Sequence, residues 1–212
     1  MILICPTITA ENSHTYREQI ERVEKFTNHV HLDLMDGVFT PNTSIDPEHL
    51  WMPDNMTCDV HAMYEDPASI FAEVMKLSVR TVIAPVECED KLKHLAHKVH
   101  QHGAQFGVAL LHDTPVDAVK QHLAYSDHVL LFSGNLGYQG GSTADLSILG
   151  RAAELKSLKP SLEIGWDGGV NDTNCAALVR AGISVINSGG FIQFASDPAA
   201  AYHRLVDIAH QS

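Results

Sequence analysis

The chain lacks any long apolar run. No stretch of its 212 residues approaches the roughly 20 apolar residues that a membrane-spanning helix needs. The opening segment, residues 1–6, is too short for the apolar part of a secretory signal and has no basic start. Ser/Pro-rich tracts and runs of one charge, which mark linkers, are also missing. We therefore expect one soluble, cytoplasmic domain over residues 1–212, without a membrane partner.

Basic residues and paired cysteines are scarce as well. Lys and Arg total 14 against 26 Asp and Glu, which gives a formal net charge of -12. Nucleic-acid grooves need clustered cations, so this balance argues against a nucleic-acid partner. It leaves room for an anionic substrate, because backbone amides at a helix N-terminus can bind phosphate. The four cysteines form no CxxC pair and are predicted to be reduced core thiols: Cys5, Cys58, Cys88 and Cys175.

Short apolar runs alternate with longer amphipathic stretches along the chain. Strands are predicted at 3–8, 30–34, 58–62, 79–84, 105–110, 128–132, 162–166 and 184–187. Helices are predicted near 13–27, 67–77, 89–102, 115–124, 144–158, 172–181 and 197–210, with a short helix or turn around 47–51. This alternation indicates an α/β fold, a (β/α)8 TIM barrel. An open doubly wound sheet is the alternative, but residues 5–9 lack its glycine-rich dinucleotide loop.

Polar side chains that point into such a barrel mark a candidate site, which lies at the carboxyl ends of the strands. A side-chain period of two turns His31 and Asp33 inward on the second strand and His61 inward on the third. Asp167 faces inward at the end of the seventh strand. Buried His and Asp are costly unless something compensates them. Two imidazoles and two carboxylates suit one divalent metal ion, with Zn²⁺ preferred and Fe, Mn or Co as alternatives.

Three sequence motifs carry a family resemblance. Residues 31–42, His-Leu-Asp-Leu-Met-Asp-Gly-Val-Phe-Thr-Pro-Asn, resemble the signature of the ribulose-phosphate 3-epimerase family. Residues 59–63 are similar to its second signature and residues 167–170 to its third, and the similarity runs from Pro6 to about Ile192. The resemblance implies a metal bound by residues matching His31, Asp33, His61 and Asp167.

The same resemblance implies the reaction. The carboxylates matching Asp33 and Asp167 lie on opposite faces of the reacting carbon, where one removes a proton and the other returns one. The expected enzyme is an isomerase of the pentose phosphate pathway that interconverts D-ribulose 5-phosphate and D-xylulose 5-phosphate. Family members assemble as dimers or larger, so we expect a homo-oligomer.

Substrate-binding residues are predicted on the same face. Met35 and Met63 form either a low-polarity cap over the planar intermediate or ordinary core packing. Thr7 keeps the hydroxyl of the family's usual serine. Glycine pairs after the later strands let backbone amides approach a phosphate, and three are candidates: Gly140-Gly141, Gly168-Gly169 and Gly189-Gly190.

Departures from the family pattern surround the substrate. The loops at 111–115 and 135–141 differ, Phe132 replaces a third methionine, and Gly165 stands where an acidic residue is usual. Two alternatives therefore stay open. One is an epimerase for a hexulose phosphate such as allulose 6-phosphate, and the other is a barrel that binds sugar phosphate or metal without turnover.

Overall fold

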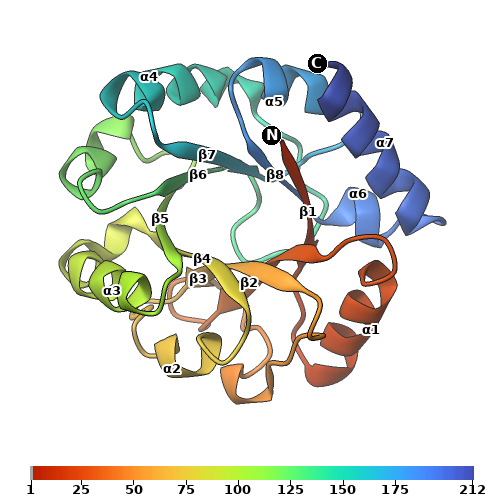
Figure 1. Ribbon diagram of the computed structural model, residues 1–212, viewed down its shortest axis with the longest axis horizontal. Coiled ribbons are helices and arrows are strands. Elements are labelled where there is room, and N and C mark those ends of the chain that lie inside the picture. Colours follow the sequence, from red (N-terminus) through yellow and green to blue (C-terminus); the bar gives the residue numbers. More distant parts are fainter. Residues whose placement is uncertain (1) are drawn as a thin grey trace.

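Eight parallel strands form a closed barrel in the order of the sequence, β1-β2-β3-β4-β5-β6-β7-β8. The computed structural model describes residues 2–212. Figure 1 shows the strands as an inner ring and the helices around them, which confirms the predicted TIM barrel. The strands are β1 (Leu3–Ile8), β2 (His29–Met35), β3 (Thr57–Met63), β4 (Val79–Pro85), β5 (Gln105–Leu110), β6 (His128–Phe132), β7 (Glu163–Asp167) and β8 (Val185–Ser188).

The helices match the predicted positions more closely than the predicted lengths. They are α1 (Ser13–Val23), α2 (Phe71–Val74), α3 (Glu89–Gln101), α4 (Gly150–Leu158), α5 (Cys175–Arg180), α6 (Gly190–Gln193) and α7 (Pro198–Gln211). Short 3₁₀ helices are η1 (Pro47–His49), η2 (Val86–Cys88), η3 (Val116–His122) and η4 (Leu146–Leu149). No helix of residues 2–212 has the length and apolar character that crossing a membrane requires.

Two predicted helices were wrong in extent or type. The stretch 67–77 is helical only in α2, because Asp66 accepts a hydrogen bond from Ala68 N and Ser69 Oγ donates to Asp66 O. These local bonds hold a turn where the helix was expected to begin. The stretch 115–124 forms the 3₁₀ helix η3 in place of an α-helix.

The barrel wall separates two kinds of packing. Alternate residues of β2, Val30, Leu32 and Leu34, join the main hydrophobic core between the strands and the helices. A separate cluster of Ile83, Ala109 and Leu130 comes from β4, β5 and β6. Buried polar residues also lie on the strands, among them His29, Asp59 and His128 toward the strand starts and Asp33 and Asp167 toward the strand ends.

Candidate metal and substrate site

Four ionisable side chains from three strands meet near the carboxyl ends of the barrel strands. His31 and Asp33 come from β2, His61 from β3 and Asp167 from β7, and one ligand atom of each lies within 4.8 Å of the others. His31 Nε2 lies 3.3 Å from Asp33 Oδ1 and 3.9 Å from Asp167 Oδ2. His61 Nδ1 lies 3.5 Å from Asp33 Oδ1. Tertiary structure therefore brings together the four residues that the sequence motifs predicted as metal ligands; that they bind a metal stays a prediction.

Several polar atoms of these four buried side chains have no hydrogen-bond partner among residues 2–212. His31 and His61 are fully buried, and Asp33 and Asp167 are buried at 8% and 7% exposure. Both ring nitrogens of each histidine, and Asp33 Oδ1, have no hydrogen-bond partner. A buried polar group without a partner costs free energy, so the arrangement indicates that something else pairs with these atoms.

The two carboxylates sit in electrostatically different positions. Burial opposes ionisation of Asp33, but the imidazoles of His31 and His61 outweigh it and hold the pKa of Asp33 well below its usual value. Burial and the nearby Asp33 charge raise the pKa of Asp167 to about 7. The pair is thus arranged so that one carboxyl is ionised while the other can keep a proton.

A cavity of about 270 Å³ opens above this cluster. Asp33 and Asp167 line its wall, together with all nine predicted substrate-binding residues: Thr7, Met35, Met63, Gly140, Gly141, Gly168, Gly169, Gly189 and Gly190. Phe132, at the position of the missing third methionine, also lines the cavity, and its ring centroid lies 5.8 Å from that of His61. An apolar side chain is therefore retained at that position.

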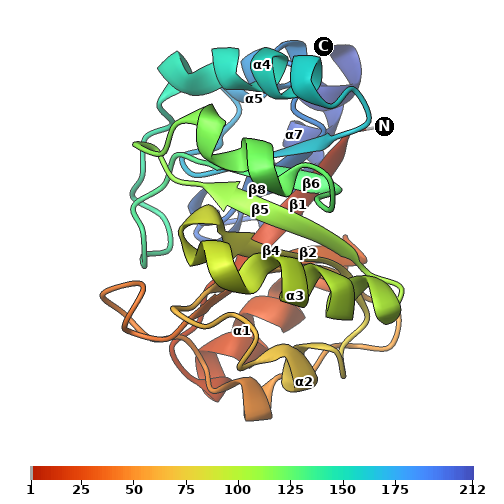
Figure 2. The same cartoon turned by 90° about the vertical axis from the view of Figure 1, so that its left-hand side faces the viewer.

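Loops of three strands approach closely around the cavity, and glycine makes this possible. Gly168 and Gly169 have φ of 110° and 69°, which L side chains rarely adopt. A Cβ at Gly168 would lie 2.1 Å from Gly134 N, and one at Gly169 would lie 2.1 Å from Ala144 N. The loops after β2 and β6 project from the same side in Figure 2, and Asn42 Nδ2 donates to Gly137 O at 2.9 Å.

Comparison with known proteins assigns the family. The model described as the ribulose-phosphate 3 epimerase family matches residues 3–193. The chain belongs to this family. The ribulose-phosphate 3-epimerase of Aquifex aeolicus is 30% identical over 97% of this chain and 96% of its own length. That of Bacillus subtilis is 29% identical over 93% and 94%. The predicted family and the predicted enzyme class, an isomerase, are confirmed.

Solved structures with similar folds are more distant in sequence. A 3-hexulose-6-phosphate synthase from Salmonella typhimurium aligns with a TM-score of 0.75 at 12% identity, and 99% of each chain is covered. KGPDC from Streptococcus mutans also has a TM-score of 0.75 at 12% identity, over 100% of this chain and 98% of that one. These likenesses support the barrel fold alone.

Several cavity residues of this epimerase-family chain were missed by the sequence reasoning, and Thr9 and Asn187 are two of them. Asn187 of β8 is 1% exposed, lines the cavity, and has no hydrogen-bond partner at either amide atom. It pairs in register with Asp167 of β7. A polar residue at the end of a predicted strand was the available signal, and period two would have turned it inward with Val185.

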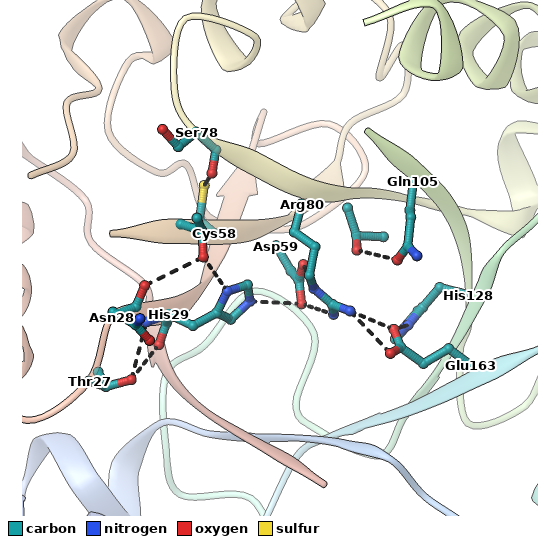
Figure 3. A network of polar contacts seen from close by, with 12 residues as sticks. Thr27, Asn28, His29, Cys58, Asp59, Ser78, Arg80, Gln105, His128 and Glu163 are labelled. Atoms are coloured by element: carbon teal, nitrogen blue, oxygen red, sulfur yellow. Dashed lines mark hydrogen bonds and ion pairs between the residues drawn. The ribbon is translucent and has the colours of Figure 1, made fainter. Parts of the chain in front are cut away.

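A second buried polar network occupies the opposite, amino-terminal end of the barrel (Figure 3). Arg80 Nε donates to Asp59 Oδ1 at 2.8 Å, and Arg80 Nη1 lies 2.9 Å from Glu163 Oε2. His29 Nε2 lies 3.2 Å from Asp59 Oδ2, and His128 Nδ1 lies 2.8 Å from Glu163 Oε2. In TIM barrels the amino-terminal end contributes to stability, while the active site lies at the carboxyl-terminal end. We therefore assign this charged network to stability.

Ligand-type atoms of Cys5, His29 and Asp59 also come within 4.8 Å of one another in this network. Arg80 contacts both carboxylate oxygens of Asp59. The guanidinium already neutralises this carboxylate, so the His31, Asp33, His61 and Asp167 cluster is the better candidate for a cation.

Two local features shape the network. Cys58 pairs with Val79, and Asp59 with Thr81, so Arg80 is an extra residue in β4. Such a bulge re-aims a side chain, and it explains how Arg80 reaches the barrel end. At Gly165, the departure from the family's acidic residue, an added Cβ would lie 2.5 Å from His128 Nε2. The imidazole therefore fills the space that a side chain at position 165 would need.

Proposed function

We propose that this chain is a metal-dependent ketose-phosphate 3-epimerase that interconverts D-ribulose 5-phosphate and D-xylulose 5-phosphate. The observation that carries the proposal is the buried His31, Asp33, His61 and Asp167 cluster beneath a cavity with glycine-rich walls. The names of the curated relatives from Aquifex aeolicus and Bacillus subtilis support the pentulose substrate.

The donor set fits one divalent cation. The unpartnered nitrogens of His31 and His61 and the unpartnered Asp33 Oδ1 are ligand atoms of the kind that zinc and other first-row divalent ions accept. We propose that these residues and Asp167 hold the ion, with Zn²⁺ preferred over Fe, Mn or Co. A bound divalent ion supplies Lewis-acid stabilisation of the negative charge that develops on the ketone oxygen.

The two aspartates would perform the proton transfers. The carboxylate of one removes the proton from C3, and the electron pair of the C–H bond moves toward the ketone. The carboxylic acid of the other then delivers a proton to the opposite face, which inverts C3 without any oxidant or reductant. Support comes from their unequal protonation: the pKa of Asp33 is held low, while that of Asp167 is raised to about 7.

The remaining cavity residues would bind and shield the substrate. Met35 and Met63 are buried in the cavity wall, where their thioethers would cover the planar intermediate and exclude water. The glycine pairs at 140–141, 168–169 and 189–190 expose backbone at the same wall, and we propose that their amides bind the phosphate. Thr7 Oγ1 is buried without a partner and is free to contact a substrate oxygen.

The cavity is small. Its volume of about 270 Å³ lies just below the usual range for small-molecule sites, roughly 300–1,000 Å³. We therefore propose the pentulose phosphate, the smaller of the two candidate substrates. A role in the pentose phosphate pathway, a cytoplasmic location and a homo-oligomeric state stay predictions.

Turnover of D-ribulose 5-phosphate by metal-stripped and metal-restored protein tests the function. We expect activity to require the added ion, and Asp33→Asn and Asp167→Asn each to abolish turnover in a folded protein. Faster turnover of a hexulose phosphate would favour the alternative substrate. Stoichiometric metal binding without loss of C3 deuterium to water would show a barrel that binds without catalysis.

A further inference from the structure

Thr9 forms a hydrogen bond with the carboxylate of Asp33 and none with that of Asp167. It lies directly after β1, is partly buried, and lines the cavity. Its Oγ1 donates a hydrogen bond to Asp33 Oδ2 at 2.8 Å. Asp167 comes from β7, and its Oδ2 lies 3.9 Å from His31 Nε2.

The two carboxylate oxygens of Asp33 have different surroundings. Oδ1 has no partner and faces the imidazoles of His31 and His61 at 3.3 and 3.5 Å. Oδ2 faces Thr9. The terminal torsion of an aspartate is broad and roughly two-fold, so packing alone does not decide which oxygen points where. The hydrogen bond from the Thr9 hydroxyl distinguishes Oδ2 from Oδ1.

Thr9 is itself held in place by a buried amide. Gln19 of α1 accepts from Thr9 N at 3.0 Å through Oε1 and donates to Thr9 O at 3.0 Å through Nε2. Gln19 Nε2 also donates to Gln139 Oε1 at 3.0 Å, and Gln139 Nε2 donates to Thr7 O at 3.0 Å. Two glutamines from distant parts of the chain thus fix the backbone that carries the hydroxyl.

We propose that Thr9 is a positioning residue for the proton transfer at Asp33. A carboxylate oxygen has two lone-pair directions. The Thr9 hydroxyl occupies one at Oδ2, which leaves the second for the C3 proton, while Oδ1 stays with the imidazoles. This inference rests on the proposed epimerase function, and it makes the two aspartates unequal, because only Asp33 is oriented by a hydroxyl.

The inequality gives a signature that a merely structural role would not produce. Thr9→Val keeps the branched shape and removes the hydroxyl, so the step at Asp33 should slow. In the reaction direction where Asp33 removes the proton, the primary isotope effect of C3-deuterated substrate should rise. In the reverse direction Asp33 delivers the proton, so the substrate isotope effect should fall and the solvent isotope effect should rise.

The experiment compares the wild-type protein, Thr9→Val and Thr9→Ser in both directions. For Thr9→Val we expect kcat to fall about 10- to 100-fold and KM to stay within about twofold, with the opposite isotope changes described above. Thr9→Ser, which keeps the hydroxyl, should restore most of the rate. Gln19→Met should produce the same pattern more weakly, because it releases the Thr9 backbone without touching Asp33.

Wild-type rates in Thr9→Val would overturn the proposal, as would isotope effects that shift alike in both directions. A Thr9→Ser variant as slow as Thr9→Val would overturn it too. A wild-type protein that leaves both pentulose phosphates unchanged would instead overturn the epimerase function, and this inference with it.

Discussion

Replacing Arg80 by leucine should destabilise the barrel strongly, although Arg80 is far from the cavity. The Asp59 side chain is 1% exposed, while those of Arg80 and Glu163 are 26% and 29% exposed. Removing one partner of a buried ion pair costs about 3–5 kcal/mol. Because Arg80 and Glu163 keep some contact with water, we expect the lower end, about 3 kcal/mol, which lowers Tm by roughly 6–12 °C in a chain of this size.

The loss of unfolding free energy in Arg80→Leu should depend on pH. Burial opposes ionisation of Asp59, but His29 and Arg80 outweigh it and hold its pKa well below the usual value. A lowered folded-state pKa contributes stability above the unfolded value, about 3.9, and this stability is lost as pH falls through the folded value. Without Arg80, burial should raise the Asp59 pKa. The difference in unfolding free energy between the wild-type protein and Arg80→Leu should therefore be largest near pH 7 and shrink toward pH ~4.

Urea unfolding followed by tryptophan fluorescence measures this gap, since Trp166 is fully buried. Arg204→Leu is the matched control, because Arg204 pairs with Asp172 at 2.7 Å but is 66% exposed, and its unfolding midpoint should move much less. Adding Asp59→Asn to Arg80→Leu should recover part of the loss. An unchanged midpoint in Arg80→Leu, or a gap that is constant with pH, would refute the reasoning.

Three further predictions concern the cavity end. Asn187→Leu removes a buried amide that has no hydrogen-bond partner. Tm should therefore stay level or rise, while KM for the pentulose phosphate increases about tenfold or more. A lower Tm with unchanged KM would show that the amide serves packing. Gly168→Ala should unfold several degrees earlier in a thermal melt and lose activity, because its Cβ would lie 2.1 Å from Gly134 N at a φ of 110°; a wild-type melt would contradict this. A divalent ion at 100 times its Kd should stabilise the metal-stripped protein by about 2.7 kcal/mol, measured as a Tm increase that His61→Ala abolishes.

Local periodicity carried the sequence predictions that succeeded. The alternation of His31 and Asp33 with Val30, Leu32 and Leu34 follows from the two-residue repeat of a strand, which every parallel barrel keeps. The strand positions, the closed barrel and the clustering of two histidines with two aspartates could therefore be predicted from the sequence. Helix extent could not, because the turn held by Asp66 competes with the start of α2 through local hydrogen bonds.

Contacts between residues far apart in the sequence were set by closure of the barrel, and no local sequence pattern indicates them. Thr9 meets Asp33 across 24 residues, and Gln19 meets Gln139 across 120. Arg80 lies at the bulge in the pairing of β3 with β4, and such a bulge can re-aim its side chain. Such contacts depend on strand register and on which loops share one rim, and these are set when distant strands pair, whereas the sequence alone specifies only which face of its own strand each side chain occupies.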